Sequence, residues 1–292
     1  MNDTGSNGSH HRDHSRQWRD FHYVYPVVSR RSRGLSVGVN LNPQKHCNFG
    51  CLYCQVDRSI PGRPLELDLN LLRSELRAVL EQAVSGEIWQ DAKFQAVPAD
   101  RKRINDIAFS GDGEPTCVPQ LPEAVEAAAE VKRQLGLDDV KLILITNASR
   151  LAAEPFRRAR PILDDNNGEI WAKLDAGTEE TFQRVNRPAG GLTLEDIVQN
   201  ILGLAVARPV VIQTLLLALD GQPPSQAELD AYARHVRGIV AAGGQVQFIQ
   251  LHTVARTPAD PSAQPLGREQ LDEAGRYLAA AVQPVPVEVF HS

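Results

Sequence analysis

Apolar runs and amphipathic segments follow one another along this chain in a regular order. Six apolar runs predict buried strands, at residues 35–41, 106–111, 140–146, 169–175, 209–218 and 245–252. These runs are nearly continuous in their apolar character, which is typical of parallel strands that are covered on both faces. A shorter run at residues 285–290 predicts a closing strand.

Segments with a helical period separate the apolar runs. They predict helices near residues 69–84, 119–135, 151–160, 179–185, 194–207, 225–243 and 268–282. Asp68 is the expected N-cap of the first helix, while Thr193 with Asp196 resembles a capping box, a pattern that Ser225 and Glu228 repeat. Six β–α units in sequence predict the α/β class, as a partial (βα)6 TIM-like barrel with parallel strands.

The first 20 residues differ from the rest of the chain because they are almost entirely polar. They include His10, His11 and His14, a cluster that can bind metal adventitiously. We expect residues 1–20 to form a disordered polar tail. Residues 21–292 show neither an internal repeat nor a second domain, so they predict a single core domain.

Composition narrows the class of protein further. Hydrophobic residues make up 42% of the chain, enough for a large core, and the net charge is −5. This balance excludes a whole-protein basic field that gathers nucleic acid, although a local basic patch stays open. No apolar run approaches the roughly 20 residues that span a bilayer, and the N-terminus has no apolar signal segment. We expect a cytoplasmic protein without membrane contact.

Three of the four cysteines lie in "NPQKHCNFGCLYCQ", directly after the first predicted strand. Their spacing is Cys47-x3-Cys51-x2-Cys54, and clustered thiols in such a chain indicate metal. Structural zinc and ferredoxin-type clusters each take four protein ligands. Three ligands leave a coordination position open, which is typical of a catalytic centre. Two alternatives stay open: an electron carrier with Cys117 as fourth ligand, and a zinc module with His46.

The cysteine loop, with Tyr53 before its third cysteine, resembles the signature of radical S-adenosyl-L-methionine (SAM) enzymes. The resemblance implies that Cys47, Cys51 and Cys54 hold a 4Fe-4S iron–sulfur cluster and that SAM binds the open iron. It also implies reductive cleavage of SAM to a 5′-deoxyadenosyl radical, which abstracts hydrogen from a substrate. A reductant such as flavodoxin or ferredoxin would supply the electron.

A second element of that family is a Gly-Gly-Glu turn after the second strand, which binds the amino group of the methionine moiety. Here "SGDGEPT", residues 110–116, stands at that place. The resemblance assigns Gly111, Gly113 and Glu114 to SAM binding, although Asp112 separates the two glycines. Glycine lets a backbone approach a ligand closely, whereas the same letters taken alone predict only a β-turn.

Polar residues at later strand ends complete the implied cofactor site. Asn147 lies in "ITNAS" after the third strand, and Lys173, Asp175 and Gln213 lie at the fourth and fifth strand ends. By resemblance Lys173, Asp175 and Gln213 contact the ribose and carboxylate of SAM, and Asn147 and Tyr53 also belong to the cofactor-binding residues. The alternative for each is an ordinary polar pair or cap at the end of a strand.

The substrate is less constrained than the cofactor. "SGDGEPT", "KLDAG" and "NRP" resemble the wyosine-type tRNA-modifying synthases and their bacterial relatives, which implies a tRNA base as substrate. The acidic charge balance and the lack of a basic stripe count against RNA. His252 and Arg256 follow the sixth strand, where a substrate can bind. The sequence leaves small-molecule, protein and RNA substrates open, and it assigns no catalytic side chain.

Overall fold

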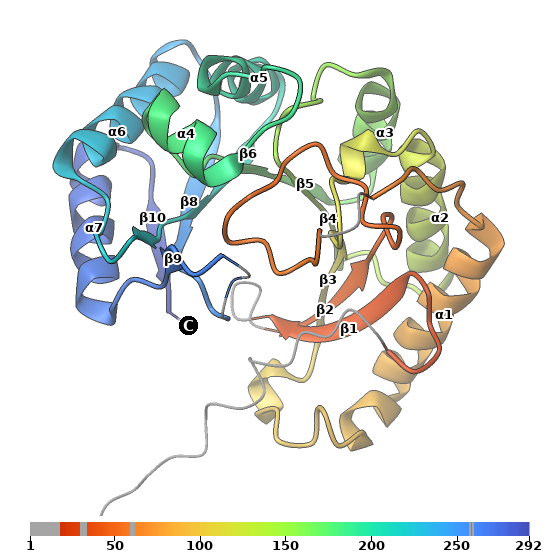
Figure 1. Ribbon diagram of the computed structural model, residues 1–292. Coiled ribbons are helices and arrows are strands. Elements are labelled where there is room, and N and C mark those ends of the chain that lie inside the picture. Colours follow the sequence, from red (N-terminus) through yellow and green to blue (C-terminus); the bar gives the residue numbers. More distant parts are fainter. Residues whose placement is uncertain (1–17, 30–33, 59–61, 257, 259, 292) are drawn as a thin grey trace, which may run out of the picture.

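The protein is built on an eight-stranded sheet that curls into an open half barrel with helices outside it (Figure 1). The computed structural model describes residues 18–29, 34–58, 62–256, 258 and 260–291. The strands, in their order across the sheet, are β1 (Val24–Ser29), β2 (Gly34–Val39), β3 (Ile104–Phe109), β4 (Lys141–Thr146), β5 (Gly168–Lys173), β6 (Val210–Leu215), β8 (Val246–His252) and β10 (Val287–Phe290). The predicted α/β class and partial TIM-like barrel are confirmed.

Strand β1 is the part of the sheet that the apolar pattern missed. It pairs antiparallel with β2, whereas every other neighbouring pair in the sheet is parallel. Pro26 has no backbone N–H to donate to a neighbouring strand. A strand tolerates such a residue when it lies at the edge of a sheet. The predicted closing strand is confirmed as β10, which pairs parallel with β8.

The fifth predicted strand is shorter than its apolar run. Strand β6 ends at Leu215, and residues 218–219 instead form β7 (Ala218–Leu219), which pairs antiparallel with β9 (Ala263–Gln264). The predicted extent of 209–218 was therefore wrong, because the chain leaves the barrel after Leu215 to build this small ribbon above its rim.

Seven α-helices among the described residues follow the predicted order. They are α1 (Leu69–Ser85), α2 (Leu121–Gln134), α3 (Glu154–Asp165), α4 (Glu179–Asn186), α5 (Leu194–Ala207), α6 (Gln226–Ala241) and α7 (Arg268–Ala281). Asp68 caps α1, and the capping box at the start of α5 forms as predicted. Ser225 caps α6, but Glu228 does not complete a box, because its carboxylate accepts from the backbone N–H of Gly177 at 2.5 Å.

The boundary of the core lies before the predicted position. Residues 1–17, with the three clustered histidines, fall outside the described part of the chain. Trp18, which the sequence placed in the polar tail, is 5% exposed, and its ring centroid lies 5.5 Å from that of Phe94. The packed core therefore begins no later than Trp18.

Side chains that point into the barrel form two layers. A lower apolar layer contains Ala108, Ile143, Trp171 and Val211. Two positions further along β5 and β6, the same inward face carries the polar side chains of the upper layer, because side chains alternate along a strand. The barrel thus has an apolar layer beneath a polar mouth at the carboxyl ends of its strands, while Ser36 and Asp106 also line the cavity from β2 and β3. None of the helices described has both the length and the apolarity that crossing a membrane requires.

Candidate active site

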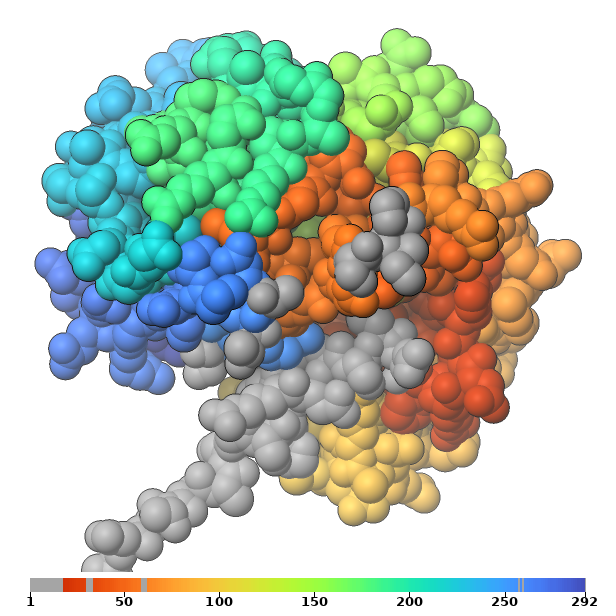
Figure 2. Space-filling model, viewed as in Figure 1, coloured from red at the N-terminus to blue at the C-terminus, as the bar shows by residue number. Residues whose placement is uncertain are grey.

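A cavity of about 380 Å³ opens at the carboxyl ends of the strands. Figure 2 shows the loop after β2, in orange, at the centre of this face, between α4 in green and the blue segment around β9. The cavity is lined by all of the predicted site residues except Asp175, namely Cys47, Cys51, Tyr53, Cys54, Gly111, Gly113, Glu114, Asn147, Lys173 and Gln213. Residues that are up to 166 positions apart in sequence thus share one pocket, as their strand-end positions predicted.

The backbone of the "NRP" segment holds the cysteine loop in place. Leu52 N–H donates to Val185 O at 2.8 Å, and Gly50 N–H donates to Arg187 O at 3.0 Å. The side chain of Arg187 points away to the surface, where its guanidinium pairs with Asp260 at 3.1 Å. The cysteine loop therefore runs alongside the end of α4, and the position of each thiol depends on both segments.

Burial controls the protonation of the cysteine thiols in the metal-free chain. All four cysteines are free thiols. Burial raises the pKa of Cys47 to about 11 and, together with the nearby Asp175 carboxylate, raises that of Cys51 to about 12. Metal binding must then displace these protons, because the thiolate is the ligand. In the described part of the chain, no three His, Cys, Asp or Glu side chains are grouped so as to hold a single metal ion.

The "SGDGE" turn lies against the cysteine loop, and its glycines make this approach possible. A Cβ on Gly113 would lie 1.8 Å from the carbonyl oxygen of His46, and one on Gly111 would lie 2.2 Å from Asn40 Oδ1. Both distances are far inside van der Waals contact, so only glycine fits at either position. Asn40 in turn fixes Asp112, since its Nδ2 donates to Asp112 Oδ2 at 2.7 Å.

Glu114 is tied into the protein by four donors. Its Oε1 accepts from the backbone N–H of Thr116 at 3.1 Å, from Thr116 Oγ1 at 2.7 Å and from Thr146 Oγ1 at 2.6 Å. Its Oε2 accepts from the backbone N–H of Asn147 at 2.7 Å. Burial raises the pKa of this carboxyl, and the hydrogen bonds oppose that rise. The carboxylate joins the glycine turn to the end of β4, a link that the sequence did not indicate.

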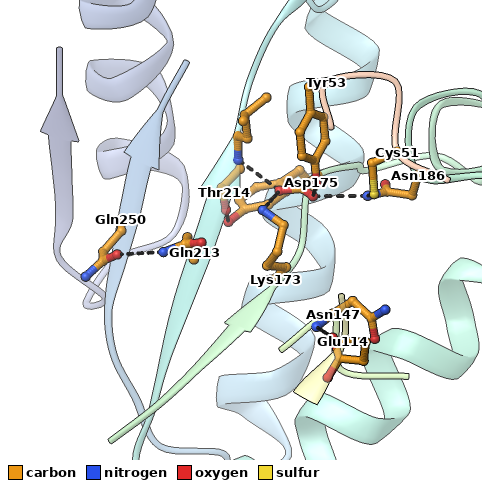
Figure 3. A network of polar contacts seen from close by, with 12 residues as sticks. Cys51, Tyr53, Glu114, Asn147, Lys173, Asp175, Asn186, Gln213, Thr214 and Gln250 are labelled. Carbon is orange, nitrogen blue, oxygen red and sulfur yellow. Dashed lines mark hydrogen bonds and ion pairs between the residues drawn. The ribbon is translucent and has the colours of Figure 1, made fainter. Parts of the chain in front are cut away.

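A second polar network surrounds the carboxylate of Asp175, whose side chain is fully buried (Figure 3). Oδ2 accepts from the Tyr53 hydroxyl at 2.5 Å and from Asn186 Nδ2 at 3.0 Å. Oδ1 accepts from Lys173 Nζ at 3.2 Å and from the backbone N–H of Leu215 at 2.9 Å. Asp175 therefore lies behind the cavity wall and holds Lys173 and Tyr53, which do line the cavity.

The remaining predicted residues occupy neighbouring parts of the wall. Gln213 and Gln250 are adjacent on β6 and β8, and the amide of Gln213 donates to the other at 3.2 Å. Asn147 Nδ2 donates to Asn48 Oδ1 at 2.9 Å, so this side chain contacts the cysteine loop directly. His252 also lines the cavity, where the sequence placed a substrate.

These residues fit an iron–sulfur cluster with SAM bound beside it. Three thiols, the ligand type that such clusters take, line one cavity next to a turn whose glycines leave room for a ligand. Beside the thiols, Arg58 Nε and Asn186 Oδ1 are buried and make no hydrogen bond within the described chain. The site therefore has three thiols that can bind a cluster and two unpaired polar atoms that can contact a further polar group.

Comparison with known proteins gives the family of this half barrel with three thiols at its mouth. The Radical SAM superfamily profile matches residues 41–232, so the chain belongs to the radical SAM superfamily. A GTPase Obg of Brachyspira hyodysenteriae is 26% identical over 87% of this chain and 33% of its own length. A UPF0026 protein of Methanocaldococcus jannaschii is 29% identical over 61% of the chain and 47% of its own length. The chain thus spans between a third and a half of these two relatives.

Solved structures show the same architecture. A radical SAM methyltransferase from Sphaerobacter thermophilus superposes with a TM-score of 0.58 and 19% identity. The match covers 89% of this chain and 67% of that one. At this identity the likeness is one of fold.

Proposed function

We propose that this chain is an enzyme that holds a 4Fe-4S cluster on Cys47, Cys51 and Cys54 and cleaves SAM reductively. The observation that carries the proposal is the convergence of the three thiols and the Gly111–Gly113 turn on one cavity. Such a cluster, when reduced, supplies the electron that breaks the S–C5′ bond of SAM, giving methionine and a 5′-deoxyadenosyl radical for hydrogen abstraction.

Different residues of this chain bind different groups of SAM. The backbone at Gly111 and Gly113 lies open to the cavity and accepts the methionine ammonium. Lys173, whose side chain is 19% exposed, offers an ammonium to the methionine carboxylate, and Asp175 holds it in that position. Tyr53, Asn147 and Gln213 supply further polar contacts to the cofactor from the same wall.

The apolar layer of the barrel supports the same chemistry. Ala108 and Trp171 line the cavity and present apolar surface to it. A reactive carbon radical benefits from such an enclosed site, because contact with dissolved molecular oxygen destroys it. An oxygen-labile cluster also suits a reducing cytoplasm and an external reductant such as flavodoxin or ferredoxin.

The alternatives to a SAM-cleaving enzyme differ in their fourth ligand. An electron carrier needs four protein thiols, and Cys117 is not among the residues that line the described cavity. A structural zinc site does not account for the glycine turn or for the Lys173–Asp175 pair. The geometry therefore supports a three-thiol catalytic centre, while modification of a tRNA base stays a prediction of the sequence motifs.

The test is the formation of 5′-deoxyadenosine. The protein is loaded anaerobically with iron and sulfide, reduced with dithionite and incubated with SAM. We expect product from the wild type and from Cys117→Ala, and none from Cys47→Ala, Cys51→Ala or Cys54→Ala. Undiminished product in any of the last three variants would contradict the assignment.

A further inference from the structure

Two side chains beside the cysteine loop direct N–H groups at the cluster thiols. Arg58 Nη2 lies 3.7 Å from Cys54 Sγ, and Asn186 Nδ2 lies 3.7 Å from Cys51 Sγ. We propose that Arg58 and Asn186 are positioning residues that set the reduction potential of the cluster by donating hydrogen bonds to its thiolates. This inference rests on the proposed function, because it requires the cluster.

Arg58 is fixed in place by two further hydrogen bonds. Its Nη1 donates to the carbonyl of Lys45 at 2.6 Å, and its Nη2 donates to the carbonyl of Asp112 at 3.0 Å. One carbonyl belongs to the cysteine loop and the other to the glycine turn. The guanidinium therefore bridges the two loops that surround the proposed cofactors, and it lies beside Cys54.

Asn186 is fixed from the opposite side of the site. It is 3% exposed and shares its amide group between Cys51 and the Asp175 carboxylate, which lies 3.0 Å away. The end of α4 that carries it is bound to the cysteine loop through the Leu52–Val185 backbone hydrogen bond. Its amide can thus neither rotate away nor exchange with solvent freely.

Hydrogen bonds to cluster sulfur change the potential because reduction adds negative charge to the cluster. An N–H donor stabilises the more negative state, and hydrogen bonds to the sulfurs are among the factors that set iron–sulfur potentials. A charged donor in a buried site acts more strongly than a neutral amide. Arg58 should therefore raise the potential more than Asn186 does, while the negative Asp175 opposes both.

The test is a redox titration of the cluster in the absence of SAM, in which the EPR signal reports the reduced fraction. Full-length wild type is compared with Arg58→Gln and Asn186→Leu. We expect Arg58→Gln to lower the ratio of reduced to oxidised cluster at a fixed potential about tenfold, which is about 59 mV for one electron. We expect Asn186→Leu to lower that ratio about threefold, as a neutral donor should.

Matched controls separate the sulfur contacts from charge and from helix stability. Arg63→Gln removes one positive charge five positions further along the chain, from a side chain that is exposed. Gln183→Leu removes an exposed amide from the same helix as Asn186. Both controls should titrate like the wild type. Curves of Arg58→Gln and Asn186→Leu that overlay those of their controls would overturn the inference.

A measurement on the wild type alone tests the inference even if the variants fail to assemble a cluster. Protein labelled with 15N-arginine is reduced, and pulsed EPR records coupling between the cluster spin and the guanidinium nitrogen. Absence of this coupling overturns the Arg58 contact even if SAM is cleaved normally. A wild type that assembles a four-iron cluster but forms no 5′-deoxyadenosine instead contradicts the proposed function, while the titration still tests the two donors.

Discussion

The backbone N–H of Asn147 donates to Glu114 Oε2 at 2.7 Å, and this contact joins the turn after β3 to the end of β4. The Thr146 hydroxyl, 2.6 Å from Oε1, reinforces it. The acid of the glycine–acid pair is therefore built into the wall of the site. Glu114 fixes the shape of the turn whose backbone faces the cavity.

Replacing Glu114 by Gln should loosen this wall. The amide replaces one of the two acceptor oxygens by an NH2 group, which then faces at least one of the four donors, and hydrogen bonds to charged groups contribute about 1.5–3 kcal/mol each. We expect the free energy of unfolding to fall by about 2 kcal/mol or more, and SAM affinity to fall about tenfold. Urea denaturation of the metal-free protein measures the first effect. Glu126→Gln, on the exposed side of α2, should stay within about 0.5 kcal/mol of wild type. Equal stability of the two variants would contradict the account.

Replacing Gly113 by Ala should separate the two loops. The added methyl meets the His46 carbonyl oxygen at 1.8 Å, so one loop must move away. We expect binding of SAM to the cluster-loaded protein to weaken about tenfold or more. The reason is that the backbone of the glycine turn must approach SAM closely to bind it. Equilibrium dialysis measures this affinity. Gly203→Ala in α5 meets nothing within 4 Å and should bind SAM like the wild type.

Replacing Tyr53 by Phe removes one donor from the buried Asp175 carboxylate. The hydroxyl lies 2.5 Å from Oδ2, and its loss leaves that oxygen with Asn186 alone. We expect a loss of about 1–3 kcal/mol in the free energy of unfolding, with the cluster retained. Tyr277→Phe removes a hydroxyl that contacts Asp230, which is only partly buried, so it should cost less. The account does not survive if Tyr277→Phe is the more damaging variant.

The metal-free protein should lose stability in alkali. Burial raises the pKa of Cys51 from 9.0 to about 12, so above pH 9 the thiol ionises in the unfolded chain first. The stability that the protonated thiol contributes is complete below pH 9 and is lost as the pH rises toward 12. Unfolding midpoints at pH 8 and pH 10 measure this loss. Cys51→Ser, which does not titrate there, should show a smaller difference between the two pH values, and an unchanged difference would refute the assignment.

The sequence predicted those parts of the molecule that follow from a local pattern of apolar and polar residues. Strands β2 to β6 and β8 follow from apolar runs, and the places of the candidate residues at strand ends agree with their position around one cavity. Strand β1 was missed because Pro26 interrupts an otherwise apolar run, and proline argues against a strand except at a sheet edge. The fifth strand was drawn too long, because β7 continues the same apolar run in another sheet.

The contacts around the site were beyond the sequence because they join distant segments. Asn186 reaches Cys51 across 135 positions, and nothing in "NRP" indicates which side chain turns inward. Arg58 lies only four residues after Cys54, yet its carbonyl partner Asp112 lies 54 positions further on. Such positions depend on how the strands are assembled, which local patterns do not encode.

The central claim is that three thiols hold a cluster whose open iron binds SAM, and the EPR spectrum of the reduced protein tests it most directly. The spectrum is recorded on anaerobically reconstituted wild type, before and after addition of SAM. We predict the signal of a four-iron cluster that shifts when SAM is added. A four-iron signal that saturating SAM leaves unchanged would show that the fourth iron already has a ligand, and it would contradict the account.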